Sequence, residues 1–433
     1  MSDIRRASIG RTLHSAAHIC FIAFLSLTLL TYSGEWDQGP FAWGALRLPG
    51  LPLHIGVLSF LPVVAAASGA MAWRLTGRRP TWGLGRRGLG RPMLALTIWA
   101  LLNLGQASQP ALVVVMLGLW GGVMLFLLNE EPALVWPLAL TAALQAAVGV
   151  GQFVSQHSLG LTWLGEPMLD PQQAGVSVVM NAGARWLRAY GINSHPNRLG
   201  LKLTLLLLML LGLRPRVAGR ARAWLDALCL IGGMGLLVSL SRSAWLGLGV
   251  GLTVLAYPHL AVWRTERAGF RTIRPIWWQT SGPVVMIGLL FLSVYGGVVF
   301  GRFFALDHPL EQRSLTERAR DLPIALELLR AHPWAGVGVG QSVAAAQALN
   351  PQAGLVHNVP LLIGAELGWP GLLLWLWLLI TPLARPGAWS AHLPRTALWL
   401  ALVVIGLLQP ELSPFTLQGA VLLGLVCGVV GRT

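Results

Sequence analysis

Charged residues are scarce in this chain of 433 residues. Only 11% of the residues are charged, acidic residues number 16, and 55% of the residues are hydrophobic. Such a composition leaves too little polar surface to cover a soluble globule of this length, so it predicts a polytopic membrane protein. Internal repeats, low-complexity tracts and a separate soluble domain are also missing from the sequence. Residues 1–433 are therefore expected to form a single membrane domain.

Cysteine is almost as scarce, and its placement excludes two kinds of site. Cys20, Cys229 and Cys427 all stand inside apolar stretches, where a thiol behaves as a small hydrophobic side chain. Neither a disulfide framework nor a cysteine zinc cluster is expected. Outside the predicted spans the sequence has no His-x-x-x-His, Cys-x-x-Cys or Asp-x-Asp grouping, so we expect no metal and no other cofactor at the site.

Long apolar runs dominate what remains. A helix that crosses a bilayer needs about 20 mostly apolar residues, and the first run lacks the cleavage site of a signal peptide. The sequence predicts an all-α fold with about twelve transmembrane helices, near residues 13–32, 54–73, 93–108, 110–128, 133–153, 199–213, 224–240, 243–263, 282–300, 357–381, 396–409 and 415–431.

The formal charge of +15 orients these spans. Arginines bunch in alternate connectors, which is typical of membrane topology, so we expect no nucleic-acid partner. Counted along the chain, one side receives Arg5, Arg6, Arg11, Arg74, Arg78, Arg79, Arg86, Arg87, Arg91, Arg214, Arg216, Arg220, Arg222, Arg264, Arg267, Arg271, Arg274, Arg385, Arg395 and Arg432. The positive-inside rule makes this side cytoplasmic and places both termini there.

Two long segments fall on the other side, at 154–198 and 301–356. Both exceed the usual length of a structureless loop, so they are expected to fold. The second lies between the ninth and tenth spans and is predicted to be an extracytoplasmic loop subdomain with a helix near 315–331. Ser314 and Glu317 have the Ser-x-x-Glu spacing of a capping box that would begin this helix.

Arginines on this cation-poor side need a reason other than topology. Arg242 stands at a turn between two spans without a carboxylate nearby in sequence, where a guanidinium is costly unless it meets an anion. The others are Arg185, Arg188, Arg302, Arg313, Arg318 and Arg320, all of which fall outside the predicted spans. A guanidinium matches phosphate oxygens, which favours a diphosphate head group, whereas Arg313 and Arg320 more often pair with nearby carboxylates on a helix.

His357 stands where the long segment meets an apolar helix. A neutral imidazole could accept a proton from a hydroxyl there, although a histidine at a helix start also commonly bonds a loop carbonyl. Glu366 lies nine residues further on and is either functional or hydrogen-bonded to another span. His195, His308 and His332 each precede proline, which favours a role in a turn. The Gly336-Val-Gly-Val-Gly sequence follows a predicted helix, so a flexible turn is favoured over a nucleotide-binding loop.

Four motifs occur in a meaningful order. They are Gly191 with His195-Pro-Asn-Arg-Leu-Gly; Ser241-Arg-Ser-Ala-Trp-Leu-Gly; Arg318 ahead of His332-Pro-Trp-Ala-Gly-Val-Gly-Val-Gly; and His357-Asn358 with Glu366 and Gly368. Together they resemble the O-antigen ligase and O-antigen polymerase superfamily of bacterial membrane glycosyltransferases. The resemblance covers roughly residues 180–380, and the earlier spans match only in hydropathy.

The resemblance implies a GT-C-like enzyme of the bacterial inner membrane that transfers a glycan from undecaprenyl diphosphate to an acceptor hydroxyl on the periplasmic side. The transfer would be inverting and metal-independent. His357, Arg242 and Arg318 would be catalytic, while the diphosphate or the glycan would be bound by Arg188, Arg185, Asn197, Asn358 and Arg313. The acceptor would be a lipid A core sugar for a ligase, another lipid-linked glycan for a polymerase, or a protein side chain for an oligosaccharyltransferase. A transporter of lipid-linked glycans is the alternative from another class, although it would favour ionisable groups at the midplane of related halves.

Overall fold

The computed structural model describes residues 3–30, 46–47, 54–55, 61–84, 88–265, 270–303, 309–384 and 392–432, and within these ranges the chain is mostly helical. The helices are α1 Asp3–Leu30, α2 Leu61–Thr76, α3 Gly90–Leu102, α4 Pro110–Asn129, α5 Val135–Ser155, α6 Pro196–Leu213, α7 Gly219–Ser239, α8 Arg242–Thr265, α9 Phe270–Phe303, α10 Pro309–Ala331, α11 Ser342–Leu349, α12 Val359–Ile380, α14 Leu393–Gly406 and α15 Leu417–Gly431. Two short antiparallel pairs join β1 Leu46–Arg47 to β2 His54–Ile55, and β3 Val178–Asn181 to β4 Ala184–Leu187.

Six helices of the described residues are long and apolar enough to cross a membrane. They are Ser8–Leu30, Pro110–Asn129, Val135–Ser155, Pro196–Arg216, Gly219–Ser239 and Val359–Ile380. Four shorter apolar helices, Gly90–Leu102, Met286–Arg302, Leu393–Gly406 and Leu417–Gly431, accompany them. The chain thus has the helices of a multi-pass membrane protein, while the count of about twelve spans stays a prediction.

Small residues let these helices pack closely. A Cβ added to Gly235 of α7 would lie 2.4 Å from the Ala146 Cβ of α5, and one on Gly428 of α15 would lie 2.6 Å from the Leu127 Cβ of α4. Between apolar helices in lipid, association depends on such close van der Waals contact, because lipid is as apolar as leucine. These contacts join α5 to α7 and α4 to α15.

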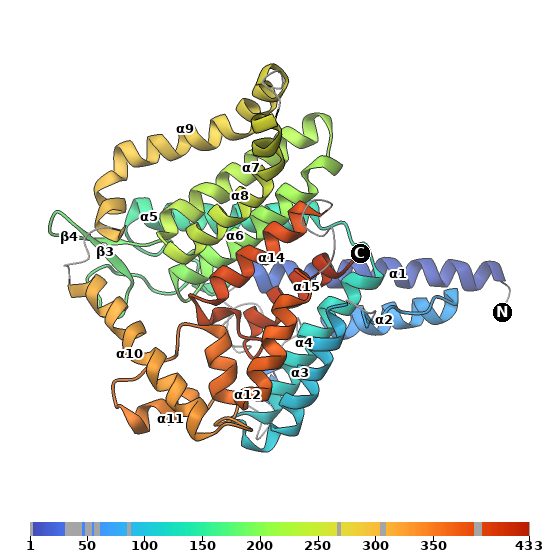
Figure 1. Cartoon of the computed structure of the whole chain (residues 1–433). Helices are drawn as coiled ribbons and strands as arrows, with labels where there is room; N and C mark the ends of the chain where they lie inside the picture. Colours follow the sequence, from blue (N-terminus) through green and yellow to red (C-terminus); the bar gives the residue numbers. More distant parts are fainter. Residues whose placement is uncertain are drawn as a thin grey trace.

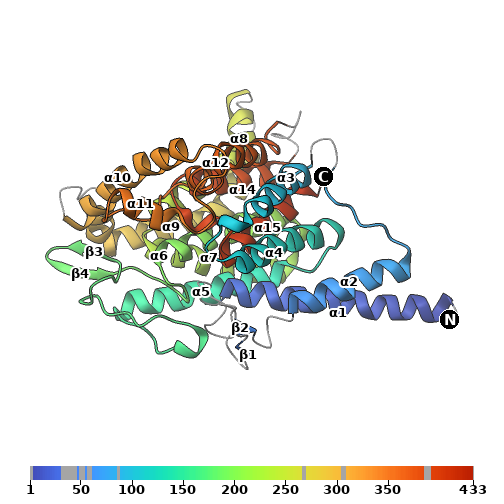
Figure 2. The same ribbon diagram turned by 90° about the horizontal axis from the view of Figure 1, so that it is seen from below.

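The long helix α1 connects two ends of the bundle. Just past the middle of α1, His18 Nε2 lies 3.1 Å from Glu130 Oε2 at the end of α4, and near the last residue of α1 the Leu29 carbonyl accepts from Lys202 Nζ of α6 at 3.0 Å. Eleven residues of helix separate His18 from Leu29, or about 16 Å. We call these the Glu130 end and the His357 end of the bundle. The β3–β4 hairpin, α10 and α11 lie at the opposite side of the molecule from the free start of α1 (Figures 1 and 2).

Two local predictions are wrong. The helix expected near 315–331 is present within α10, but α10 begins at Pro309, so Ser314 lies inside the helix and the expected capping box does not begin it. Proline suits the first helical position because its missing N–H has no partner there in any case. Arg302, expected in the long segment, lies in the last turn of α9, which continues to Phe303.

Candidate functional site

Two glutamines of α5 hold the segment that leads into α6. Gln145 and Gln152 are seven residues apart and therefore share a helix face. The Oε1 atom of Gln152 accepts from the N–H groups of Tyr190 and Gly191 at 3.0 and 2.8 Å, and that of Gln145 accepts from Ile192 at 2.9 Å. Gly191 is required because a Cβ would lie 2.5 Å from Gln145 Oε1 at a φ of +57°. The buried amides thus fix the backbone just ahead of His195.

His195 is the N-cap of α6 and is neutral. Its Nδ1 accepts from the Asn197 N–H at 3.2 Å, so the ring proton resides on Nε2. Burial lowers the pKa of the imidazole from 6.5 to about 3. The charges of its neighbours act in the same direction, and these neighbours are Arg188, Arg198, Arg302 and, when protonated, His357. The role in a turn that the sequence favours for His195 is present, and the histidine also marks the centre of a cationic cluster.

Arg188 is a buried organiser of this cluster. Its side chain is 2% exposed and donates to the Ser239 carbonyl at 3.0 Å, to Ser177 Oγ at 2.9 Å and to Asn197 Oδ1 at 2.9 Å. These bonds join the end of α7, the loop before β3 and the start of α6. Arg188 and Asn197, both expected to bind substrate, are therefore directed at each other.

The α7–α8 turn places Arg242 as the first residue of α8. Leu240 takes a left-handed conformation with a φ of 47°, which lets α8 begin two residues later. Ser241 and Ser243 flank Arg242, and both hydroxyls bond the buried amide nitrogen of Gln409. Arg242 is thus held half-buried beside the loop between α14 and α15.

Two further residues tighten this turn. A Cβ on Gly200 of α6 would lie 2.8 Å from the Cβ atoms of both Ser241 and Ala244, so only glycine permits this approach. Arg302 at the end of α9 is 7% exposed and donates to the Leu240 carbonyl at 3.2 Å. Helices α6, α8 and α9 therefore meet at the turn that carries Arg242.

His357 directly precedes α12 at the same end. Its neighbour Asn358 is the N-cap, with Oδ1 accepting from the Leu361 N–H at 2.9 Å, while Nδ2 donates to the Leu407 carbonyl at 3.2 Å. The Nδ1 atom of His357 is buried and has no hydrogen-bond partner among the described residues. Burial lowers the pKa of this imidazole below 6.5, and the charge of Arg318 lowers it further. His357 is therefore a neutral imidazole whose Nδ1 has no hydrogen bond among the described residues.

Helix α10 places charges of both signs near His357. Asp321 and Glu317 raise the pKa of His357 and partly offset Arg318. Asp321 is 3% exposed, accepts from Arg320 Nε at 2.9 Å, and accepts from the Gly354 N–H at 3.2 Å. The carboxylate thus fixes the chain three residues before His357, and Arg320 has the pairing with a carboxylate that its helix position favours.

Glu411 and Arg198 belong to this cluster although neither was expected in it. Glu411 lies in the short 3-10 helix Pro410–Leu412 between α14 and α15, and its Oε2 is buried with no hydrogen-bond partner in the described part of the chain. Burial raises the pKa of the Glu411 carboxyl, and the charges of Arg198 and Arg318 oppose that rise. The only signal for Glu411 in the sequence was an acidic residue in a loop on the cation-poor side.

Glu366 has a structural role. Its Oε1 accepts from the Gly340 N–H at 3.0 Å and from Ser342 Oγ at 2.8 Å, so its hydrogen bonds go to the segment around the start of α11 and not to another span as expected. The glycine-rich segment packs against α12, since a Cβ on Gly336 would lie 2.3 Å from the Glu366 carbonyl carbon. The backbone of Val337 and Gly338 bonds the carbonyls of Ala365 and Glu366 at 2.9 and 3.0 Å. This segment is a tight packing turn.

Two expected ligands stand apart from these contacts. Arg185 lies in β4 and its Nε donates to the Pro171 carbonyl, within the same extended segment. Arg313 lies in α10, and its side chain is outside the described residues. Neither arginine is joined to His357 by any contact of the described residues.

The arrangement is suited to an anion beside a nucleophilic hydroxyl. Guanidinium groups converge on one end of the bundle from α6, α8, α9 and α10, and these are Arg198, Arg242, Arg302 and Arg318. Fixed cations in a water-poor site stabilise developing negative charge where it is worth most. A neutral imidazole in the same place can accept a proton.

Comparison with known families agrees with the motifs. Residues 227–376 match the family model described as O-antigen ligase, which confirms the resemblance to this superfamily. The matched range contains Arg242, Arg318 and His357, and excludes Arg188, Arg198 and Glu411. No curated protein matches the chain.

Proposed function

We propose that this chain, whose residues 227–376 match the O-antigen ligase family, is a glycosyltransferase of the ligase type in the bacterial inner membrane. It moves a glycan from undecaprenyl diphosphate to an acceptor hydroxyl such as that of a lipid A core sugar. The His357 end faces the periplasm and both termini are cytoplasmic, in line with the positive-inside distribution of arginines.

His357 carries this proposal. Its buried Nδ1 has no hydrogen-bond partner among the described residues, and its pKa is lowered by burial and by Arg318. An unfilled acceptor in a buried position costs free energy unless a ligand fills it. A hydroxyl group of an acceptor sugar would supply the missing donor.

In the transfer step, the acceptor hydroxyl oxygen forms a bond to the anomeric carbon as its proton passes to His357. The bond between that carbon and the diphosphate oxygen breaks, and its electron pair stays on the diphosphate. A single displacement of this kind inverts the anomeric configuration. The protonated imidazole then returns its proton to solvent or to the released diphosphate.

Arg318 and Arg242 receive the charge of the leaving diphosphate. The charge of Arg318 acts on both His357 and Glu411, so this arginine lies near the proposed proton acceptor. Arg188 and Asn197 position the start of α6 and with it Arg198 and His195. The guanidinium groups take the part that a divalent cation plays in other diphosphate chemistry, so the transfer is proposed to be metal-independent.

The test uses the purified full chain in liposomes with an undecaprenyl-diphosphate glycan and either lipid A core or a second lipid-linked glycan as acceptor, with EDTA present. Release of undecaprenyl diphosphate and glycan on lipid A core, detected by mass spectrometry, is expected. Growth of the lipid-linked chain instead would make the protein a polymerase. Movement of the intact lipid-linked glycan across the bilayer without bond cleavage would make it a transporter and overturn the proposal.

A further inference from the structure

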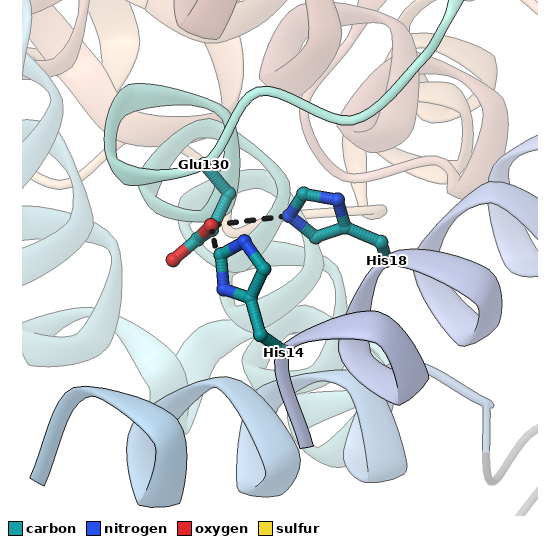
Figure 3. Close-up of side chains that lie close together, drawn as sticks. All are labelled: His14, His18 and Glu130. Atoms are coloured by element: carbon teal, nitrogen blue, oxygen red, sulfur yellow. Dashed lines mark hydrogen bonds and ion pairs between the residues drawn. The ribbon is translucent and has the colours of Figure 1, made fainter. Parts of the chain in front are cut away.

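A second cluster of titratable groups lies at the Glu130 end. His14 and His18 are four residues apart and so share one face of α1, and Glu130 directly follows α4. Glu130 Oε2 lies 3.2 Å from His14 Nδ1 and 3.1 Å from His18 Nε2 (Figure 3). All three ligand atoms lie within 4.8 Å of one another.

This cluster is separate from the proposed transfer site. His18 stands about 16 Å along α1 from Leu29, whose carbonyl receives Lys202 at the His357 end. The proposed transfer assigns no role to α1. Any ligand of these histidines would therefore bind at the opposite end of the bundle from His357.

The spacing of the three atoms matches a transition-metal site. Zinc binds imidazole nitrogen and carboxylate oxygen at about 2.0–2.2 Å, which places neighbouring ligand atoms of a tetrahedron about 3.3 Å apart. The separations of 3.1 and 3.2 Å lie close to that edge. Two histidines at i and i+4 on a helix, with a carboxylate from elsewhere, form an established zinc-binding arrangement.

The carboxylate is oriented from behind. Trp73 Nε1 of α2 donates to Glu130 Oε1 at 2.6 Å, which leaves Oε2 directed at the two rings. The His18 ring meets Phe126 edge-on at 5.8 Å between centroids. Partners of this kind fix the ligands of a metal site and raise its affinity.

The three side chains of the cluster differ in exposure. The side chain of Glu130 is 2% exposed, that of His18 is 20% and that of His14 is 39%. A buried carboxylate is costly unless a cation or several donors meet it.

We propose that His14, His18 and Glu130 bind a zinc ion, with the fourth position open to water. The ion would cross-link α1 to the connection between α4 and α5, and Trp73 would extend this clamp to α2. Each imidazole binds through a nitrogen lone pair, so any proton on His14 Nδ1 or His18 Nε2 is released to solvent or moves to the other ring nitrogen.

The test measures zinc in the full-length protein, purified through a tag without histidine, stripped with EDTA, incubated with zinc sulfate and dialysed. Mass spectrometry of the metal is expected to give about one zinc per chain. His14→Ala/His18→Ala should lower affinity at least 100-fold, and Trp73→Phe by about 10–100-fold, as for other outer partners. His157→Ala is the matched control, because His157 is exposed and bonds its neighbouring Ser158 carbonyl.

Equal zinc binding by wild type and the double variant would overturn the site, as would wild type that retains none. Cobalt(II) gives a measurement that needs no variant, since a four-coordinate site yields an intense visible absorption and an octahedral one only a weak band. A weak band in wild type would also overturn the proposal. Transfer activity is independent of these readouts, so this site and the proposed function can fail separately.

Discussion

Histidines stand at both ends of the helix bundle in opposite electrostatic surroundings. At the His357 end, His195 and His357 face guanidinium groups that lower their pKa values. At the Glu130 end, His14 and His18 face one buried carboxylate. Histidine is thereby kept neutral at the His357 end, where it can accept a proton. At the Glu130 end, histidine stands beside a carboxylate with which it can bind a cation.

The contrast extends to the groups around the histidines. Among the described residues of the His357 end, arginines outnumber the carboxylates that face them, which favours an anionic ligand. The Glu130 end instead gathers two imidazoles and one indole N–H around one acid, namely His14, His18 and Trp73. We therefore propose a diphosphate ligand for one end and a metal cation for the other.

Replacing His357 tests the contrast with the largest expected effect. His357→Ala removes the proton acceptor, and kcat should fall by about 10²–10⁴, the usual contribution of general base catalysis. Glycan transfer measured by mass spectrometry gives the rate. His332→Ala is the control, because His332 is exposed and lies on the same side. Wild-type turnover in His357→Ala would remove the proposed base.

Replacing Arg318 sharpens the contrast through pH. Arg318→Gln should lower kcat by about 10²–10³, as for loss of a group that stabilises transition-state charge. Because the charge of Arg318 lowers the pKa of His357, its removal raises that pKa. The acid limb of the kcat profile should then move to higher pH, since His357 becomes protonated sooner as the pH falls. Arg330→Gln, an exposed change in the same helix, should leave the limb in place. If the acid limb did not move in Arg318→Gln, the charge of Arg318 would not act on the pKa of His357.

Glu411 is an acid among the cations of the His357 end. We expect its replacement to change kcat less than replacement of His357 or Arg318. Glu411→Gln keeps the shape but removes the charge that faces Arg198 and Arg318. Arginines without this partner attract the diphosphate more strongly, so KM should fall. They are also less well oriented, so kcat should fall about tenfold, which is less than the roughly 10²-fold loss for a misplacement of 1 Å. Glu327→Gln, exposed on α10, is the control for charge alone. A fall in kcat with raised KM would mean that Glu411 holds the fold instead.

Much of the architecture could be predicted from hydropathy. The choice of His357 rested on the order of the motifs. Each predicted span overlaps a helix, because an apolar run of this length must satisfy its backbone within itself. The boundaries were less accessible: α10 begins five residues before its apparent capping box, at a proline.

Long-range pairing hid the remaining residues of both ends. Glu411 joins Arg198 across more than 200 residues of sequence, and nothing near Glu411 in the chain indicates a cation. His14 and His18 have visible spacing, yet they fall at the start of an apolar run and their carboxylate stands 112 residues beyond His18. Arg188 bonds Ser177 and Asn197 nearby in the chain, but its bond to the Ser239 carbonyl spans 51 residues and has no signal in the local sequence.

The neutral state of His195 predicts a pH dependence of stability, the smallest of the expected effects. Folded His195 takes up a proton only near pH 3, whereas the unfolded chain does so near 6.5, so acidification through this window favours unfolding by up to about 1.4 kcal/mol per pH unit. His195→Asn keeps an acceptor for the Asn197 N–H and cannot titrate. Its Tm, followed by intrinsic fluorescence in detergent, should fall several degrees less than that of wild type between pH 6.5 and 4.5. His157→Asn, at an exposed position, should follow wild type. If His195→Asn followed wild type as well, His195 would be charged within the arginine cluster, and the contrast between the two ends would no longer hold.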